Sequence, residues 1–314
     1  SAAPGGAPGG RRQARVPAPP GRPRRVFFPA ASCFAWRVPA SAHLRCLRVK
    51  PPRCLVLHLL AGLGLLVALP AVGAAAPADS PPNFRRPRDE AELRHWLENM
   101  VVFHRFSPEE VGLATGLTTA EVERAQERFA LKGRKPPPPV PGDPLHVLPY
   151  PGGRHPRTGF LEGAIAPQRE TKVSVFTPWD DAAYVVADVP EAIWSNLGLT
   201  YLAHTHIDTI WTAREVTLPP LEWRRRDDGA LEAGRTLPNG IAFGTVVRPG
   251  PDAVRMEMWL RNGTPERLTD LRVQNCVMLK GAPEFAGSTN RVLQAPFAAA
   301  GDAAGRRWVI TAWE

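Results

Sequence analysis

Residues 241–264 read IAFGTVVRPGPDAVRMEMWLRNGT, and this stretch indicates the fold of the larger part of the chain. Two apolar runs, Ile241–Val247 and Ala253–Arg261, are separated by the turn-forming residues Pro249–Asp252, and Asn262–Thr264 follows the second run. Short apolar runs bounded by Gly, Pro, Asn and Asp are typical of β-strands joined by tight turns. The stretch therefore predicts two antiparallel strands connected by a hairpin.

The same pattern extends in both directions, from Leu145 to the last residue of the chain. Strands are expected at Lys172–Phe176, Tyr184–Asp188, Thr200–Ala203, Leu221–Arg226, Leu231–Leu237, Ile241–Val247, Ala253–Arg261, Leu271–Leu279 and Trp308–Trp313. Closely spaced strands without intervening helices predict a mainly β protein with an antiparallel β-sandwich or barrel over residues 145–314. Because Glu314 falls inside an apparent strand, we expect this domain to continue beyond it.

A small three-helix module is predicted over residues 83–132. Asp89 with Glu92, Ser107 with Glu110 and Thr118 with Glu121 each have the spacing of a helix N-terminal capping box. Apolar residues recur on one face after each start, as an amphipathic helix requires. Residues 133–144, which include four consecutive prolines, then predict an extended polyproline spacer between two domains.

Residues 108–130 resemble a helix-turn-helix, with Gly112 at the helix crossing and Gly116 in the turn. The second helix of that motif, Thr119–Ala130, would carry three glutamates against two arginines. Such a helix repels phosphate groups, so we expect no nucleic-acid partner. A structural or partner-binding role of the module is the favoured interpretation.

The chain has 314 residues, of which 44% are hydrophobic, and a formal net charge of +9. Eleven of its 39 Lys and Arg residues, but none of its 30 Asp and Glu residues, lie within residues 1–76. The rest of the chain is therefore close to neutral, and the basic character belongs to the N-terminal segment. Only Cys276 lies outside that segment, which excludes an intramolecular disulfide in the remainder.

Residues 49–76 have the order of a secretory signal peptide: a basic start, the apolar run Leu55–Leu69, and the small residues Ala71–Ala76. We therefore expect an exported protein, periplasmic or extracellular. Residues 1–48 are interpreted as an upstream extension that is over-called or disordered. The alternative is an uncleaved segment that anchors the chain in the membrane.

Leu221–Leu279 resembles the galactose-mutarotase-like supersandwich of sugar epimerases and of domains in polysaccharide-active enzymes. The likeness lies in a charged hairpin, an Asn-Gly turn, Val254–Trp259, a second Asn-Gly turn and a long apolar strand. Residues 83–313 also resemble a family of exported bacterial proteins without an assigned activity, through Pro149–Arg157 and Pro190–Trp194. The first resemblance implies a carbohydrate ligand, although the His and Glu of the mutarotase reaction do not map onto this sequence. The second implies export.

Two groups of residues are candidates for a site. The basic loop that starts at Tyr150 suits carboxylates or sugars, because loops carry many binding sites and Arg recognises oxygen ligands. Its ligand-binding candidates are Tyr150, Arg154, His155, Arg157 and Arg169. The alternative for Arg169 is a surface ion pair with Glu170.

The second group contains two histidines with one residue between them, which lie on one face if they belong to a strand. The acid/base or metal candidates are His204, His206, Asp208 and Glu222. They would serve as proton donors and acceptors, or hold a single divalent metal ion, but no other cofactor is expected. Solvent-facing or hydrogen-bonded strand histidines are the alternative.

These observations predict a non-catalytic β-sandwich that binds carbohydrate or another cell-envelope component. The alternative is a mutarotase-, epimerase- or lyase-like enzyme that uses histidine as acid and base. The sequence leaves open whether any reaction is catalysed and which sugar is bound.

The signal peptide gives the first testable prediction. N-terminal sequencing of the exported protein should find a mature chain that begins between Ala75 and Asp79, because signal peptidase cuts after small residues. An exported chain that begins within residues 1–48 would contradict this interpretation.

Overall fold

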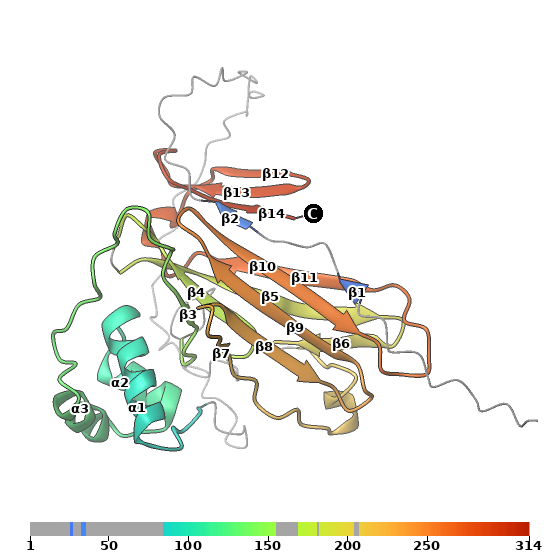
Figure 1. Cartoon of the computed structure of the whole chain (residues 1–314), viewed down its shortest axis with the longest axis horizontal. Helices are drawn as coiled ribbons and strands as arrows, with labels where there is room; N and C mark the ends of the chain where they lie inside the picture. Colours follow the sequence, from blue (N-terminus) through green and yellow to red (C-terminus); the bar gives the residue numbers. More distant parts are fainter. Residues whose placement is uncertain are drawn as a thin grey trace, which may run out of the picture.

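The computed structural model describes residues 84–154, 169–180, 182–203 and 207–313, together with the backbone of two short strands at 26–27 and 33–35. The helices are α1 (Glu90–Leu97), the π-helix η1 (Glu98–Phe103), α2 (Pro108–Thr115), α3 (Thr119–Arg128) and the short 3₁₀ helices η2 (Thr212–Arg214) and η3 (Pro283–Phe285). They precede or interrupt two antiparallel sheets (Figure 1).

The smaller sheet has the order β11-β5-β4-β3, with β6 also paired to β5. Its strands are β3 (Val147–Pro149), β4 (Lys172–Phe176), β5 (Tyr184–Ser195), β6 (Gly198–Leu202) and β11 (Arg272–Met278). Each pair in it is antiparallel.

The larger sheet has the order β12-β13-β14-β2-β10-β9-β8-β7, with β1 also paired to β10. Its strands are β1 (Val26–Phe27), β2 (Cys33–Ala35), β7 (Arg224–Arg225), β8 (Leu231–Thr236), β9 (Ala242–Pro249), β10 (Ala253–Arg261), β12 (Arg291–Gln294), β13 (Phe297–Gly301) and β14 (Trp308–Ala312). Within the described residues neither sheet closes into a barrel, and the predicted mainly β, antiparallel architecture is confirmed.

The two strands predicted from residues 241–264 are β9 and β10, which pair from Ala242 opposite Arg261 to Pro249 opposite Val254. The turn after β10 is held by the Asn262 side chain, whose Oδ1 accepts hydrogen bonds from the backbone N–H and the hydroxyl of Thr264 at 3.0 and 2.8 Å. The polar turn residues thus position the apolar runs between them, as the sequence indicates.

The centre of the five-stranded sheet, formed by β4 and β5, is buried on both faces. Val173 and Val175 of β4 face the core between the sheets, where they pack with Val247 and Met256 of the larger sheet. The intervening Ser174 faces the helices and contacts His104, whose Nε2 lies 2.7 Å from its hydroxyl oxygen. Alternate residues of β4 therefore pack between the two sheets and against the helices, and all of β4 is buried.

The helix starts follow the predicted caps. Ser107 with Glu110 and Thr118 with Glu121 form complete capping boxes at α2 and α3. Asp89 accepts a hydrogen bond from the Glu92 backbone N–H at 2.8 Å, but the Glu92 carboxylate bonds to Arg88 instead of completing the box. The three predicted helices are confirmed.

The helices pack directly on the small sheet. The Asn99 side-chain amide donates to the Pro149 carbonyl at 3.0 Å.

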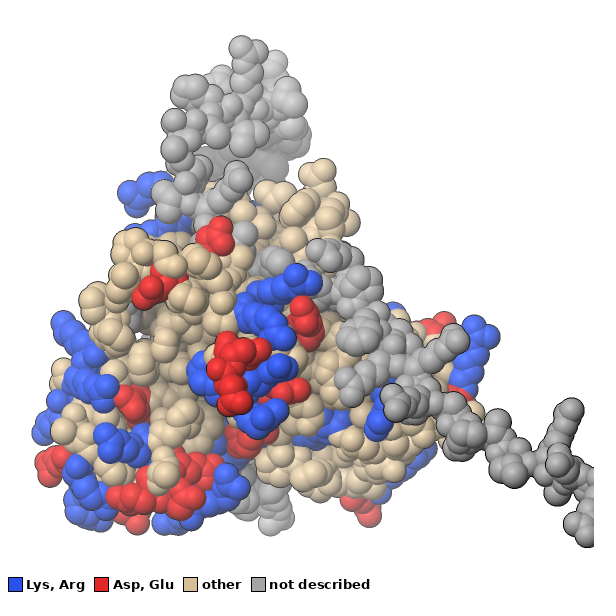
Figure 2. Space-filling model, viewed as in Figure 1, with Lys and Arg blue, Asp and Glu red and all other residues tan. Residues whose placement is uncertain are grey.

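Residues 133–144 form no helix or strand, and their prolines line a groove of 420 Å³ with Phe103, His146 and Phe176. Basic and acidic side chains alternate over the helical part of the surface in Figure 2. None of the helices in the described ranges is long and apolar enough to cross a membrane.

Gly153 offers a test of the contact between helices and sheet. A Cβ at Gly153, where φ is +76°, would lie 2.7 Å from Cβ of Ala114 in α2, whereas a Cβ at Gly133, where φ is +70°, would meet nothing within 4 Å. Gly133→Ala should lower the free energy of unfolding by about 1 kcal/mol through backbone strain alone. Gly153→Ala should lower it by about 2 to 4 kcal/mol, because the clash adds to the strain.

Urea unfolding of the two variants measures this difference. Equal losses of stability would show that α2 does not depend on close contact with the loop at Gly153.

Candidate functional site

Buried charged side chains gather at one place in the molecule. Among the described residues, the buried Arg, Lys, Asp and Glu side chains are Arg169, Glu170, Lys172, Asp188, Glu191, Arg235 and Asp302. All of these except Asp302 lie around the start of β4 and the middle of β5. We name this group, together with Arg85 and Glu222, the charged junction. Because burying charge is expensive unless it is compensated, such a concentration marks a candidate functional site.

Three strands meet at the charged junction. The Val189 backbone N–H donates to the Thr171 carbonyl at 3.1 Å, and the Ala203 N–H donates to the Glu191 carbonyl at 2.8 Å. The start of β4 and the residue after β6 therefore both contact the same short part of β5. His204 and His206 lie outside the described residues.

Glu170 is the centre of the charged junction. Its Oε1 accepts from Arg85 Nη2 at 2.6 Å and from the Leu221 backbone N–H at 3.3 Å. Its Oε2 accepts from Arg235 Nη2 at 2.8 Å and from the Tyr201 hydroxyl at 3.3 Å. Four donors therefore surround one buried carboxylate.

Glu170 also has an uncommon backbone conformation. Its φ is +38°, in the left-handed region that residues other than glycine rarely adopt. Such strain persists only where surrounding contacts impose it, and it is frequent at functional sites. The four hydrogen bonds to the carboxylate supply that constraint.

Arg169 is held in a fixed orientation beside Glu170. Its guanidinium lies 3.6 Å from the ring centroid of Trp96, and its Nε donates to the Pro151 carbonyl at 2.9 Å. Nη1 donates to Glu222 Oε1 at 3.2 Å, whereas the buried Nη2 has no hydrogen-bond partner in the described part of the chain. Burial lowers the pKa of Arg169 to about 10; Glu222 opposes this effect, and repulsion from Arg85 adds to it.

Glu222 is the exposed edge of the charged junction, with 41% of its side chain accessible. Its Oε1 accepts from Arg85 Nη1 at 2.8 Å as well as from Arg169. Arg169 and Glu222 come from the two different groups of candidates in the sequence, and the structure brings them together. Because Arg169 and Glu170 are both buried and bond to other residues, the surface ion pair proposed as their alternative is wrong.

Lys172 and Asp188 form a second, deeper part of the charged junction. Lys172 Nζ lies 2.9 Å from Asp188 Oδ2, and the two side chains are 1% and 0% exposed. The Thr171 hydroxyl donates to Asp188 Oδ1 at 2.7 Å. Lys172 and Asp188 are paired opposite each other on β4 and β5, on the face that carries Ser174. Through this pair the charged junction extends into the centre of the small sheet.

The remaining loop candidates have other surroundings. Tyr150 is 1% exposed, and its hydroxyl donates to the Arg154 carbonyl. Arg154 pairs with Glu110 of α2, with its Nε 3.1 Å from the carboxylate, and lies over the ring of Phe106. Arg154 therefore links α2 to the loop after β3, and the Tyr150 hydroxyl is bonded within that loop. His155 and Arg157 lie outside the described residues.

Asp208 is exposed, and no hydrogen bond or ion pair joins it to Glu222 in the described part of the structure. No group of three His, Cys, Asp or Glu side chains with the arrangement of a metal site occurs among the residues described. The single-metal alternative stays a prediction, because it depends on His204 and His206.

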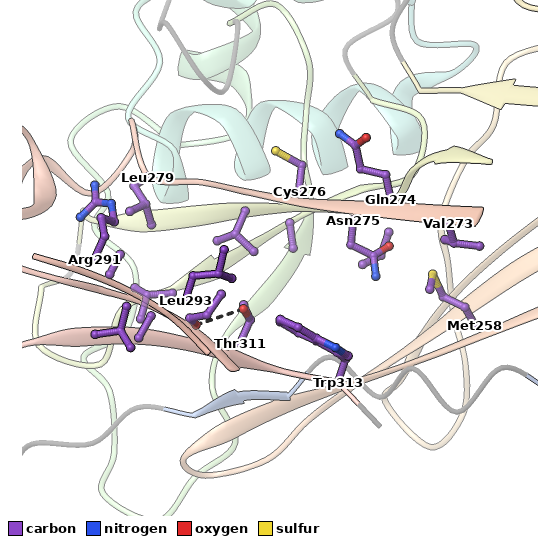
Figure 3. A pocket seen from close by; sticks show the side chains of 18 residues that line it. Met258, Val273, Gln274, Asn275, Cys276, Leu279, Arg291, Leu293, Thr311 and Trp313 are labelled. Atoms are coloured by element: carbon purple, nitrogen blue, oxygen red, sulfur yellow. Dashed lines mark hydrogen bonds between the residues drawn. The ribbon is translucent and has the colours of Figure 1, made fainter. Parts of the chain in front are cut away.

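A cleft of 740 Å³ lies elsewhere, between β11 of the small sheet and β12–β14 of the large one. In Figure 3, Asn275 points into it from β11 while Gln274 and Cys276 point away, and Trp313 faces it from the opposite side. The Thr311 hydroxyl in this cleft is bonded to the Ala298 carbonyl at 3.1 Å. Aliphatic side chains form most of the remaining lining, and none of the candidate residues from the sequence contributes to it.

The charged junction contains residues that sequence reasoning missed. Arg85, Tyr201 and Arg235 come from the segment before α1, from β6 and from β8, and no local motif connects them. Only their convergence on Glu170 identifies them.

Comparison with known proteins adds no assignment. No protein family, curated protein or solved structure matches this chain. The expected relationships to exported bacterial proteins and to galactose-mutarotase-like domains therefore stay predictions.

The same substitution at two glutamates tests the charged junction. Glu170→Gln leaves the buried Arg235 and the partly buried Arg85 without a full countercharge, and we expect a loss of about 3 to 5 kcal/mol in the free energy of unfolding. Glu222→Gln removes a contact of the same Arg85 at a half-exposed position and should lower it by less than about 1 kcal/mol.

Chemical denaturation of both variants at neutral pH measures these losses. Similar losses would show that burial of Glu170 does not set the strength of its ion pairs.

Proposed function

We propose that the protein is an exported, non-catalytic carbohydrate-binding protein of the cell envelope, and that its charged junction contacts the sugar. The observation that carries this proposal is the arrangement of Arg169 and Glu222. A fixed guanidinium and an exposed carboxylate lie 3.2 Å apart, so that a donor and an acceptor occupy neighbouring positions.

This arrangement suits neighbouring hydroxyl groups. A hydroxyl both donates and accepts hydrogen bonds, and sugars present hydroxyls in adjacent pairs. Trp96 and the Pro151 carbonyl hold Arg169, while Arg85 holds Glu222, so a ligand would order few side chains when it binds. Such preorganisation lowers the entropic cost of binding.

Two features of the sequence support the same proposal. The signal-like residues 49–76 favour export into the compartment that holds envelope carbohydrates. The stretch Leu221–Leu279, which resembles a galactose-mutarotase-like domain, includes both Glu222 and Arg235. The proposed contact surface thus lies at the start of the segment that carries the sugar-related resemblance.

A mutarotase- or epimerase-like enzyme is the second candidate. It is favoured by the position of Ala203, which is bonded to Glu191 and is followed directly by His204 and His206. Histidines attached at this point would be suited to move protons, because their usual pKa lies close to neutral pH. Turnover distinguishes this candidate from simple binding.

Glycan-array binding by the full chain tests the proposal. Arg169→Gln should weaken binding of any glycan at least tenfold, because it removes the donor of the pair. Glu222→Gln should weaken binding of neutral glycans to a similar extent, because it removes the acceptor. Arg224→Gln is the matched control, since this arginine lies two residues from Glu222 but has a side chain that is 74% exposed and paired with Glu232. Its binding should equal that of the unaltered protein.

The His204→Ala and His206→Ala variants complete the experiment. Retained glycan binding without epimerase turnover by the unaltered protein supports the binding role. Turnover that both variants lose would replace it with the enzyme. The absence of any glycan binding and of turnover would contradict both candidates.

A further inference from the structure

We propose that the sugar bound at the charged junction is acidic, and that Arg169 recognises a carboxylate on it, as in a uronic acid. This inference rests on the proposed carbohydrate-binding function and names the ligand class. It arises from the balance of charges around Glu170 and from Arg169 Nη2, a donor without a hydrogen-bond partner among the described residues.

Among the described residues, the ion pairs around Glu170 contain more positive than negative groups. Arg85, Arg169 and Arg235 are held there, against the carboxylates of Glu170 and Glu222. Both oxygens of Glu170 already accept two hydrogen bonds each. A third carboxylate would balance the three guanidinium groups.

Neighbouring acidic residues do not remove this excess. Glu92 of α1 attracts Arg169 from a distance, but its carboxylate is bonded to Arg88 at 2.8 and 2.9 Å. The deeper Asp188 is paired with Lys172. Glu191, the remaining carboxylate of the charged junction, accepts a hydrogen bond from the Gln274 side-chain amide. The nearest acidic groups in the described part of the chain thus have other partners.

Arg169 also provides the geometry for a carboxylate. Its side chain is 5% exposed, and Nη2 has no hydrogen-bond partner among the described residues, although Nε and Nη1 are both bonded. A buried donor without an acceptor is unfavourable, and binding of an anion would satisfy it. A planar guanidinium is well matched to carboxylate oxygens, and it cannot lose its charge near neutral pH.

Glu222 plays opposite roles toward acidic and neutral ligands. Its carboxylate repels a second carboxylate that approaches Arg169, so its removal should favour an acidic sugar. For a neutral sugar the same carboxylate is an acceptor for a hydroxyl, so its removal should weaken binding. One substitution therefore separates the two ligand classes by the sign of its effect.

Calorimetric titration of the full chain with trigalacturonic acid and with its fully methyl-esterified form measures this preference. The two probes share linkage and length and differ in charge. We expect the acid to bind at least tenfold more tightly at 50 mM salt, and the preference to shrink at 500 mM salt. Glu222→Gln should bind the acid several-fold more tightly and the ester more weakly.

Arg169→Gln should abolish the preference for the acid. Arg169→Lys should retain only part of it, because an ammonium group keeps the charge but loses the planar fork. Arg224→Gln should leave both affinities unchanged. Circular dichroism and thermal unfolding of each variant establish that it is folded, and the comparison between the two probes is made within each folded variant.

The possible outcomes separate this inference from the proposed function. Equal affinities, or tighter binding of the ester, would overturn the acidic ligand and leave carbohydrate binding in place. If neither probe binds, an array of acidic glycans and their neutral counterparts decides: a preference for acidic members that Arg169→Gln loses supports the inference, and binding of neutral members alone overturns it. No binding to any glycan would overturn the proposed function as well.

Discussion

The arrangement of the molecule around its charged junction depends on one buried carboxylate. Glu170 joins Arg85 before the first helix, Tyr201 in β6 and Arg235 in β8 of the larger sheet. The segment before α1 and both sheets therefore meet at a single negative charge. Because an uncompensated buried charge is far more costly than a lost apolar contact, each of these partners is fixed in place by the same requirement.

The conformation of Glu170 has a consequence for its neighbour. Glu170, which has a positive φ, lies between Arg169 and the beginning of β4. The Glu170 side chain bonds across to the larger sheet, while the Arg169 guanidinium lies over Trp96 of α1. Two adjacent residues thus connect the small sheet to the larger sheet on one side and to α1 on the other. The left-handed backbone conformation of Glu170 accompanies this arrangement.

Local rules made much of the fold predictable. Capping boxes located α2 and α3, and the turn at Pro249–Asp252 located β9 and β10. By contrast, β1, β2, β3, β12 and β13 are not among the predicted strands, and β5 continues through Pro190 to Ser195, well beyond the predicted Asp188. The start of α1 was recognisable, but the bonds of Glu170 connect residues 31 to 85 positions apart. Sequence patterns report neighbours along the chain, so Arg169 and Glu222 could be singled out as candidates while their shared partner Arg85 could not.

The cleft between β11 and β12–β14 and the charged junction differ in the ligands that they suit. The cleft in Figure 3 is lined mostly by aliphatic groups, and the Thr311 hydroxyl in its lining is bonded to the backbone. Sugar hydroxyls placed there would lose more hydrogen bonds to water than the lining replaces. At the charged junction the opposite holds, because Arg169 has a donor without a partner and Glu222 presents an exposed oxygen beside it. A polar ligand therefore gains more interactions at the charged junction than in this cleft, and the same ion pairs that fix the sheets in place also fix the groups that would bind it.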